Sequence, residues 1–285
     1  MIKVSVIITT KNEAKHIGNC LQAIKRQTYV SEQIEIVVVD NNSDDATKEI
    51  AGKFTDNIYD FGPERSAQRN FGVSKARGKY ILYLDADMII SENVVKQCVE
   101  KCENDSLIAL YIQEKIVNAS SQNIDNPDFN MKKQEFWIKV RNFERSFYDA
   151  TVVDCVRFVK RDAFNNVKGF DEKLTGPEDW DFDRKIKSCG QVGIIDAVLY
   201  HNEGRFNFAN YLKKKKYYSQ SFENYKNKWG KDDPIVKKQL GFSYRFIGVF
   251  VENGKGKQLL IHPVLALGMY LLRVFVGIAY ILRPR

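Results

Sequence analysis

Short apolar runs alternate with amphipathic segments along much of the chain. Near-continuous runs of Val, Ile, Leu and Tyr are typical of parallel strands covered on both faces, and they predict strands at 3–10, 34–40, 79–87 and 191–201. The segments between them place apolar residues at helical spacing and predict helices at 12–27, 43–54, 66–78 and 91–105, with Ser43 and Ser91 as N-caps. This alternation predicts an α/β fold with a mostly parallel sheet and helices on both of its faces.

Polar residues follow three of the predicted strands directly. They are Thr9-Thr10, Asp40-Asn41-Asn42 and Asp85-Ala86-Asp87. Because ligands of such sheets bind outside the carboxyl ends of the strands, we expect these groups to converge on one crevice. The chain has no Gly-x-Gly-x-x-Gly loop and no P-loop, which argues against a nicotinamide cofactor and against a kinase-type phosphate site.

The pair Asp85 and Asp87 is the most informative of these groups. In an extended chain both side chains point the same way, and like charges this close raise each other's pKa unless a cation or several donors lie between them. The pair is therefore either a loop before the helix at 91–105 or a metal site. An apolar strand that leads directly into two carboxylates favours the metal, since Mg²⁺ uses one or two carboxylates beside phosphate oxygens.

The amino-acid composition excludes several classes of protein. The chain has 285 residues, of which 44% are hydrophobic and 28% charged, so it is globular. Its five cysteines are odd in number and form no Cys-x-x-Cys pair, which predicts reduced thiols and argues against a disulfide frame or a zinc knuckle. No basic segment or cleavage site precedes the first apolar run, so we expect no signal peptide and a cytoplasmic location.

Positive charge is concentrated at the C-terminal end. From Arg205 onward there are 16 Lys and Arg against 4 Asp and Glu, although the whole chain has a net charge of only +8. The first 204 residues therefore carry a net negative charge. This asymmetry indicates that the protein contacts a polyanionic partner, either lipid or nucleic acid, through its C-terminal part alone.

Four blocks between residues 2 and 202 resemble the family 2 glycosyltransferases, which have the Rossmann-like GT-A nucleotide-sugar fold. In order along the chain they are VSVIITTKNE, VVVDNNSDDAT, SAQRNFGVSKARGKYILYLDAD and GFDEKLTGPEDWDFDRKI. The resemblance implies inverting sugar transfer from a nucleotide-diphospho-sugar, with a UDP-sugar expected, to a hydroxyl acceptor, with Mg²⁺ or Mn²⁺. It also implies a nucleotide-sugar-binding half at 1–105 and an acceptor-binding half with the catalytic base at 106–204.

The resemblance also implies roles for individual residues. The nucleotide-sugar donor would be bound by Thr9, Glu13, Asp40, Asn42, Arg69, Arg77 and Asp85. The metal would be held by Asp87, with Asp85 and His201 as further ligands. Asp179 would be the catalytic base, with Glu178 beside it.

The residues support the catalytic and metal roles only in combination. Glu178 and Asp179 follow Gly176-Pro177 in the first turn of a predicted helix, where the helix dipole favours any acidic side chain. Next to the other blocks, Asp179 becomes the candidate that takes the proton of the acceptor hydroxyl. His201 ends a predicted strand, where a histidine either binds a metal or is simply hydrogen-bonded. Arg69 and Arg77 could equally be solvated arginines on a helix surface.

Residues 205–285 predict a basic, aromatic helical extension. Within 206–230 the aromatic residues fall near one helical stripe, which suits the headgroup region of a bilayer. The alternative is that the aromatics pack on the catalytic core while the lysines face water. The segment 263–282 approaches the length of a spanning helix, but Arg273 near its middle favours an interfacial or re-entrant helix. A buried oligomer interface would give the same pattern, so the oligomeric state stays open.

These features leave three functions to compare. A transferase peripheral on the cytoplasmic face of a membrane would suit a lipid-linked glycan as acceptor. A polyprenyl-phosphate sugar transferase on the same fold is the nearest enzymatic alternative. A nucleic-acid-binding module that uses the basic tail is a third reading. It leaves the four N-terminal blocks unexplained, so we expect no nucleic acid among the partners.

Overall fold

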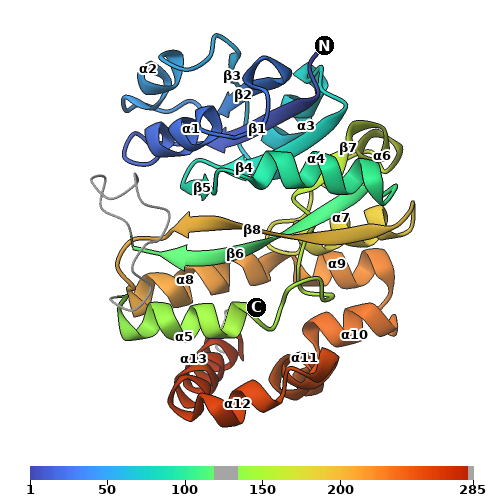
Figure 1. The fold of residues 1–285 in the computed structure, drawn as a ribbon. Helices are drawn as coiled ribbons and strands as arrows, with labels where there is room; N and C mark the ends of the chain where they lie inside the picture. Colours follow the sequence, from blue (N-terminus) through green and yellow to red (C-terminus); the bar gives the residue numbers. More distant parts are fainter. Residues whose placement is uncertain (119–133, 282–285) are drawn as a thin grey trace.

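The computed structural model describes residues 1–118 and 134–281 (Figure 1). In this part of the chain, eight strands form one sheet in the order β3-β2-β1-β4-β7-β6-β8-β5. The strands are β1 (Val4–Thr10), β2 (Ile34–Asp40), β3 (Ile58–Asp60), β4 (Tyr80–Asp85), β5 (Met88–Ile90), β6 (Ala109–Val117), β7 (Phe158–Lys160) and β8 (Val192–Asn202).

The pairing of these strands confirms a mostly parallel sheet. β1 pairs in parallel with β2 and β4, β2 with β3, and β6 with β8. The short strand β7 runs antiparallel between β4 and β6, and β5 runs antiparallel to β8. In this register Thr10 lies opposite Asp40, and Thr9 lies opposite Asp85. The predicted polar strand ends therefore lie side by side at one edge of the sheet.

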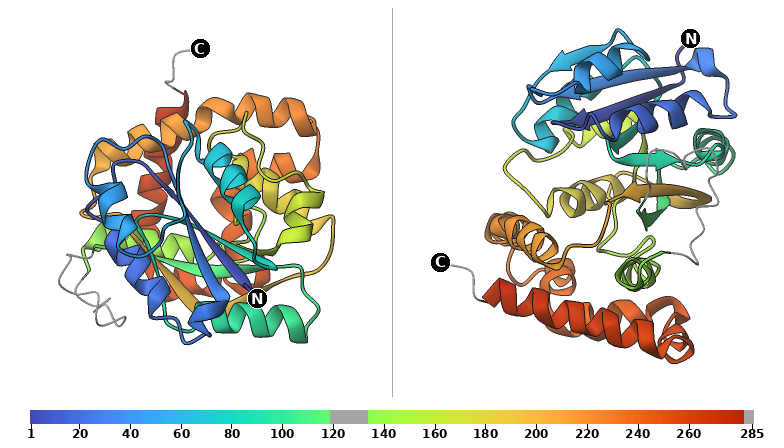
Figure 2. Two further views of the ribbon diagram at one scale, coloured as in Figure 1. Left: turned by 90° about the horizontal axis from the view of Figure 1, so that it is seen from above. Right: turned by 90° about the vertical axis from the view of Figure 1, so that its left-hand side faces the viewer.

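Helices cover both faces of the sheet and build a separate layer at one end of the molecule (Figures 1 and 2). They are α1 (Ile17–Lys25), α2 (Thr47–Gly52), α3 (Arg65–Lys75), α4 (Val94–Asn104), α5 (Phe136–Arg145), α6 (Arg161–Asn166), α7 (Glu178–Lys187), α8 (Phe208–Tyr218), α9 (Phe222–Trp229), α10 (Pro234–Leu240), α11 (Val249–Val251), α12 (Lys257–Ile261) and α13 (Pro263–Ile281). Short helical turns lie at Ser31–Gln33, Ser219–Ser221, Tyr244–Gly248 and Glu252–Gly254.

The alternation of side chains along each strand divides the core between the two faces. Val6 and Ile8 of β1 pack with α1 and α4, whereas Ile7 between them packs with α3 and α7 on the other face. All five cysteines are free, and Cys98 and Cys102 are both buried on α4. Four of the five thiols are packed in the core, and Cys189 is exposed.

Helices α1 and α2 begin four or five residues later than the pattern predicts. The backbone N–H groups of Asn12 and Ala14 donate to side chains of the loop before α2, and that of Glu13 donates to Thr47, the first residue of α2, so residues 12–14 are not helical. Ser43 is not an N-cap, because its hydroxyl donates to Asp40 and accepts from Asn12. These bonds tie together the loops that follow β1 and β2 at the edge where the polar groups gather.

The predicted single helix at 206–230 is two helices. The chain turns at Ser219–Ser221 between α8 and α9. Tyr225 on α9 is buried against Leu174 and Val236, and Tyr211 on α8 packs in the cluster formed by α5 and α13. The aromatic side chains of this segment are thus largely turned toward the protein, as in the core-packing alternative.

The single charged residue of helix α13 forms an ion pair inside the protein. Arg273 is only 7% exposed, and its Nη1 lies 2.8 Å from Oε1 of Glu144 on α5 and donates to the Tyr148 hydroxyl at 3.0 Å. The charge in the middle of this apolar segment therefore has a buried partner. None of the described helices is both long enough and apolar enough to cross a bilayer. Residue 282, at the end of the predicted segment, lies outside the described residues.

The end of α8 lies directly against the loop that leads into α7. Gly176 has a φ of +106°, and a Cβ atom built on it would lie 2.2 Å from the backbone oxygen of Tyr218. Only glycine allows both this conformation and this close approach. The first turn of α7 is thereby positioned by the C-terminal helices.

We expect Gly176→Ala to lower the free energy of unfolding by about 1–3 kcal/mol more than Gly230→Ala, measured by urea denaturation. Gly230 is a matched control, since its φ is +95° and a Cβ there would meet no atom within 4 Å. Both variants incur the cost of a left-handed residue, so the difference isolates the clash with Tyr218. Equal losses would show that the α8–α7 contact is loose.

Candidate active site

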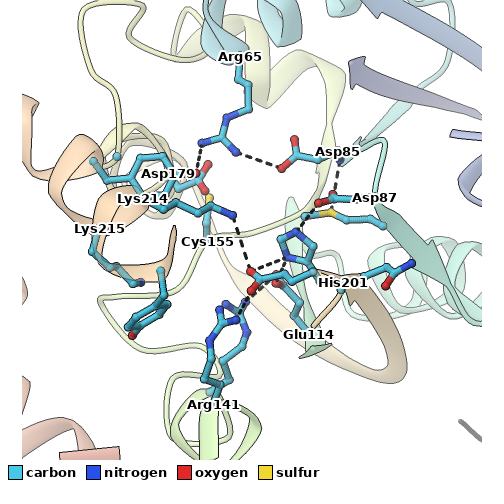
Figure 3. Close-up of a pocket in the computed structure, with 18 of the residues that line it drawn as sticks. Arg65, Asp85, Asp87, Glu114, Arg141, Cys155, Asp179, His201, Lys214 and Lys215 are labelled. Atoms are coloured by element: carbon cyan, nitrogen blue, oxygen red, sulfur yellow. Dashed lines mark hydrogen bonds and ion pairs between the residues drawn. The ribbon is translucent and has the colours of Figure 1, made fainter. Parts of the chain in front are cut away.

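A cleft of about 500 Å³ opens beside the carboxyl ends of the central strands (Figure 3). It is lined by the β4–β5 turn, the starts of α3 and α7, the end of β8, and parts of α5 and α8. Six of the residues predicted from sequence line it, namely Glu13, Asp85, Asp87, Glu178, Asp179 and His201. Groups far apart in the sequence therefore share one site.

Asp87 and His201 form a pair on one wall. His201 Nε2 lies 3.0 Å from Oδ2 of Asp87, and His201 Nδ1 lies 2.8 Å from Oε1 of Glu114. Burial lowers the pKa of His201, but the two carboxylates outweigh it and raise the pKa to about 10. The other oxygen of Asp87, Oδ1, is buried and has no hydrogen-bond partner within the described structure.

Negative charge is crowded beside this pair. Burial, followed by the charges of Asp87 and Asp85, raises the pKa of Glu13 to about 7. Together with the orphaned oxygen of Asp87, this crowding fits a site that accepts a divalent cation. The described residues hold no cluster of three or more acidic, His or Cys side chains that would enclose a metal by itself. Any metal here would therefore depend on ligand oxygens as well as on Asp87 and His201.

Asp85 is held by cations rather than left free. Its Oδ1 accepts from Thr9 Oγ1 at 3.0 Å and from Arg69 Nη2 at 3.2 Å, and its Oδ2 accepts from Arg65 Nη1 at 3.3 Å. Burial alone would raise the pKa of Asp85, but the two arginines hold it well below its ordinary value. Asp85 is thus ionised, and it anchors the arginines of α3 in the cleft.

Arg69 connects the two sides of the site. Its side chain is 1% exposed, and its Nη1 donates to Oδ1 of Asp179 at 2.8 Å while Nη2 reaches Asp85. The rings of Tyr83 and Phe170 lie about 5 Å from the guanidinium and fix its position from the sides. One buried cation therefore sets the separation of Asp85 and Asp179.

The structure distinguishes the two acids of α7. Glu178 is buried, accepts from the backbone N–H of Gly176, and pairs with Arg65. Burial and the neighbouring Asp179 raise the pKa of Glu178. The Asp179 side chain is 31% exposed and faces the cleft. Asp179 is therefore the acid that an incoming molecule can reach.

Other predicted donor ligands lie at different distances from the cleft. Thr9 is connected to the cleft through its hydrogen bond to Asp85. Asp40 is fully buried, and its two carboxylate oxygens accept hydrogen bonds from the backbone N–H and the hydroxyl of Ser43, both at 2.6 Å. Asn42 follows in the same turn with a φ of +49°.

The structure does not bring Arg77 to the cleft. It follows α3 at the opposite edge of the sheet, where its Nε lies 2.7 Å from Oε2 of Glu35 at the start of β2. The residue just before a parallel strand lies at the strand's amino end, away from the ligand edge. A contact between Arg77 and the donor is therefore not proposed.

Two important residues were missed from the sequence. Arg65 precedes Arg69 by one helical turn, so the i, i+4 spacing on α3 could have placed it on the same face. Glu114 on β6 meets His201 on β8 only because of a bulge between Ile112 and Gln113 in the pairing of these strands. No local pattern indicates that contact.

Residues 5–168 match the family model described as Glycosyl transferase family 2. The chain belongs to glycosyl transferase family 2. This match covers more than half of the chain and confirms the family resemblance; the first three sequence blocks overlap it, and the fourth begins at Gly169, just beyond it. The Asp85, Asp87 and Arg69 network lies within the matched region.

Known family 2 relatives come from archaea and bacteria. The chain is 30% identical over 230 residues to the uncharacterized glycosyltransferase MJ1057 of Methanocaldococcus jannaschii, covering 76% of each chain. It is 44% identical over 91 residues to the glycosyltransferase AglE of Haloferax volcanii, or 30% of each chain. It is 27% identical over 201 residues to GlyG of Streptococcus pneumoniae, covering 60% of this chain and 63% of that protein. The chain thus spans less than two thirds of the length of these last two relatives.

Solved transferases confirm the GT-A fold of this family 2 chain. A mannosyltransferase from Pyrobaculum calidifontis, solved with GDP-Man and Mn²⁺, superimposes with a TM-score of 0.63 at 19% identity, over 98% of this chain and 87% of that one. Residues 1–349 of Staphylococcus aureus TarS, solved with UDP-GlcNAc, give 0.56 at 18% identity, over 98% and 89%. Identities this low establish the fold alone.

In this family 2 protein we expect Arg69→Gln to lower the free energy of unfolding by about 3–5 kcal/mol, because it leaves Asp85 and Asp179 uncompensated in a buried setting. Adding Asp179→Asn should restore at least about 1 kcal/mol, since one of those charges is then absent. A double-mutant cycle in urea measures both effects. Lys48→Gln, which breaks an exposed pair with Asp60, is the control and should cost at most about 1 kcal/mol. If Asp179→Asn lowered the free energy of unfolding of the Arg69→Gln variant by the same amount as it does in the wild type, the bridging role of Arg69 would be contradicted.

Proposed function

We propose that this protein transfers a sugar from a nucleotide-diphospho-sugar to a hydroxyl acceptor, with inversion at the anomeric carbon and with a divalent cation as cofactor. The observation that carries the proposal is the arrangement around Arg69. A buried guanidinium joins Asp85, at the end of β4, to Asp179, in the first turn of α7, across one cleft. A donor side and an acceptor side are thus held at a defined separation.

The cation site would consist of Asp87 and His201. Mg²⁺ and Mn²⁺ accept carboxylate ligands, Mn²⁺ also accepts imidazole, and both are commonly completed by phosphate oxygens and water. The unpartnered Oδ1 of Asp87 fits that requirement, and Nε2 of His201 would join it after releasing the proton that it now shares with Asp87. When bound, such a cation would neutralise the diphosphate as its bond to the sugar breaks. Glu114 would keep His201 oriented through Nδ1.

Asp179 would act as the general base. Its Oδ1 is held by Arg69, so the carboxylate has one orientation and faces the cleft. The acceptor oxygen would form a bond to the anomeric carbon while its proton passes to Asp179. The bond between that carbon and the diphosphate oxygen breaks, and its electron pair leaves with the nucleoside diphosphate. Arg65, which lies beside Asp85, would stabilise the charge that develops on the leaving group.

The donor base is proposed to be uracil, read at the edge that carries Asp40 and Asn42. The solved neighbours include one complex with UDP-GlcNAc and one with GDP-Man, so both nucleotide classes need to be compared. Donor binding to the native state raises its stability, so a thermal-shift series of UDP-, GDP- and dTDP-sugars with and without Mn²⁺ identifies the nucleotide.

We expect Asp87→Ala and Asp179→Asn to separate the two roles. Asp87→Ala should abolish the stabilisation that donor and Mn²⁺ produce together, because a direct ligand of the cation is lost. Asp179→Asn should keep that stabilisation and lower nucleoside diphosphate release by about 10²- to 10⁴-fold. Asp105→Asn at the exposed end of α4 is the control and should behave as the wild type. Normal turnover in Asp179→Asn would move the base elsewhere.

We further propose that the C-terminal helices bind a membrane surface, which fits a lipid-linked acceptor. Beside the exposed polar residues Lys257, Gln258 and His262, helices α12 and α13 expose eight large apolar side chains, each at least 38% exposed: Leu260, Ile261, Val264, Leu267, Leu271, Val274, Phe275 and Ile278. Arg273 is turned inward to Glu144, so it does not interrupt this face. The partner of this face is proposed to be an anionic bilayer rather than a second copy of the protein. The excess of Lys and Arg after residue 205 would attract anionic lipid, whereas two copies of the same basic surface would repel each other.

We expect the double variant Leu267→Gln, Leu271→Gln to bind anionic phospholipid vesicles at least about tenfold more weakly than the wild type in a co-sedimentation assay, since two exposed leucines no longer enter the lipid. Val30→Gln removes an exposed apolar residue from a loop before β2 and is the control. Unchanged vesicle binding would contradict the proposal. If the wild type is a dimer and this variant is a monomer, the face would instead bind a second copy of the chain.

A further inference from the structure

Helix α8 forms one wall of the cleft with a regular stripe of side chains. Those that line the cleft are Asn207, Asn210, Tyr211, Lys214, Lys215 and Tyr218, which repeat at the three- and four-residue spacing of one helix face. All four lysines 213–216 are exposed, but only Lys214 and Lys215 line the cleft. Two of the four consecutive lysines therefore lie on the cleft side of α8 and two lie on its other side.

The carboxylates near these two lysines already have partners. Glu203 pairs with Arg141 and lies 3.8 Å from Lys214 Nζ, and Glu144 pairs with Arg273. Among the described residues no carboxylate pairs with Lys215, whose Nζ lies 5.5 Å from the centre of the Tyr211 ring. This part of the cleft wall therefore holds more positive than negative charge.

The surroundings of Lys215 make its positive charge costly. Lys215 is exposed at the cleft wall, and partial loss of hydration there, with Arg141 and Arg245 nearby, lowers the pKa of Lys215 to about 8, against the opposing effect of Glu144 and Glu203. A bound anion would reverse that balance, because it adds the missing counter-charge.

The position of this cluster assigns it to the acceptor. Figure 3 shows Lys214 and Lys215 across the cleft from Asp85 and Asp87, with Asp179 on the same side as Lys214, and Arg141 below His201, where Glu203 pairs with both Arg141 and Lys214. A donor bound at the Asp87–His201 pair would place its sugar between that pair and Asp179. The lysines of α8 then lie beyond the sugar, where the acceptor enters.

We propose that Lys215, Lys214 and Arg141 bind a phosphate group carried by the acceptor. This inference rests on the proposed transfer reaction and specifies its acceptor class. Arginine and lysine together suit a phosphate, since the planar guanidinium gives directed hydrogen bonds and the ammonium adds a point charge. The phosphate could belong to a prenyl lipid or to a phosphorylated sugar or polyol, and the test separates these sources.

The test uses the full chain and two soluble probes, glycerol 3-phosphate and farnesyl phosphate, titrated by calorimetry without metal. We expect Lys214→Gln, Lys215→Gln to weaken binding of the phosphate probes by at least about tenfold, as charge-assisted hydrogen bonds are lost. Lys213→Gln, Lys216→Gln removes the same charge from the other side of α8 and should bind like the wild type. Tighter binding of farnesyl phosphate than of glycerol 3-phosphate would identify a lipid source, and equal binding would indicate recognition of the phosphate alone.

A separate titration of UDP with Mn²⁺ distinguishes this site from the donor site. The Lys214→Gln, Lys215→Gln variant should keep the wild-type affinity for UDP and Mn²⁺ within about twofold, which also shows that it is folded. A parallel loss of UDP affinity would assign the lysines to the donor diphosphate and overturn the proposal, as would unchanged phosphate binding. Wild-type protein that binds phosphate but not UDP would contradict the transferase proposal and leave this site standing.

The pH dependence gives an independent check on Lys215. Wild-type affinity for glycerol 3-phosphate should fall as the pH rises through 8, because the amine loses its proton while the phosphate, with its second pKa near 6, keeps its charge. Lys215→Arg should retain affinity to pH 9, since a guanidinium stays protonated. The other charged groups that face Lys215 are Arg141 and Glu144 of α5, Arg245, and Glu203 after β8; the pKa of both carboxyls is lowered, so neither titrates in this range. A flat wild-type profile would exclude Lys215 from the site.

Discussion

A single buried guanidinium determines the geometry of the cleft. Arg69 comes from α3, is enclosed by Tyr83 and Phe170, and contacts one carboxylate at the end of β4 and one at the start of α7. A buried charge of this kind is tolerated only when its partners stay in place, so the sheet and α7 are held at a defined distance. The donor and acceptor sides of the proposed reaction are therefore coupled through one side chain.

The C-terminal helices complete the site. Tyr218 at the end of α8 lies against Gly176, and its hydroxyl accepts from Arg65 at 3.2 Å, so α8 supports both α7 and α3. The same helix contributes Lys214 and Lys215 to the cleft. The tail expected as a peripheral extension is thus part of the cleft wall. In the proposals above, its basic residues would bind the acceptor and its apolar face would contact lipid.

Much of the fold and half of the site were accessible from the amino-acid order. Apolar runs and helical spacing located the central strands and their helices, and the rule that ligands bind at carboxyl strand ends brought Thr9, Asp40, Asp85 and Asp87 to one edge. These inferences succeeded because each depends on a local period and on the direction of the chain. The family resemblance, in contrast, implied that Arg77 lies near the donor, and the structure puts it at the opposite edge beside Glu35.

The sequence by itself determined the strands β1, β2, β4 and β8, the helices α1 to α4 and the polar groups that end the strands, because burial of an apolar face imposes its period on neighbouring residues. Only the tertiary structure decided that Glu114 meets His201 across a bulge, that Arg273 has a buried partner, and that Lys214 and Lys215 face the cleft. Those contacts join residues about 80 to 130 positions apart or depend on how a helix is rotated against its neighbours. Such choices are made by packing and charge pairing over the whole molecule, which no local pattern records.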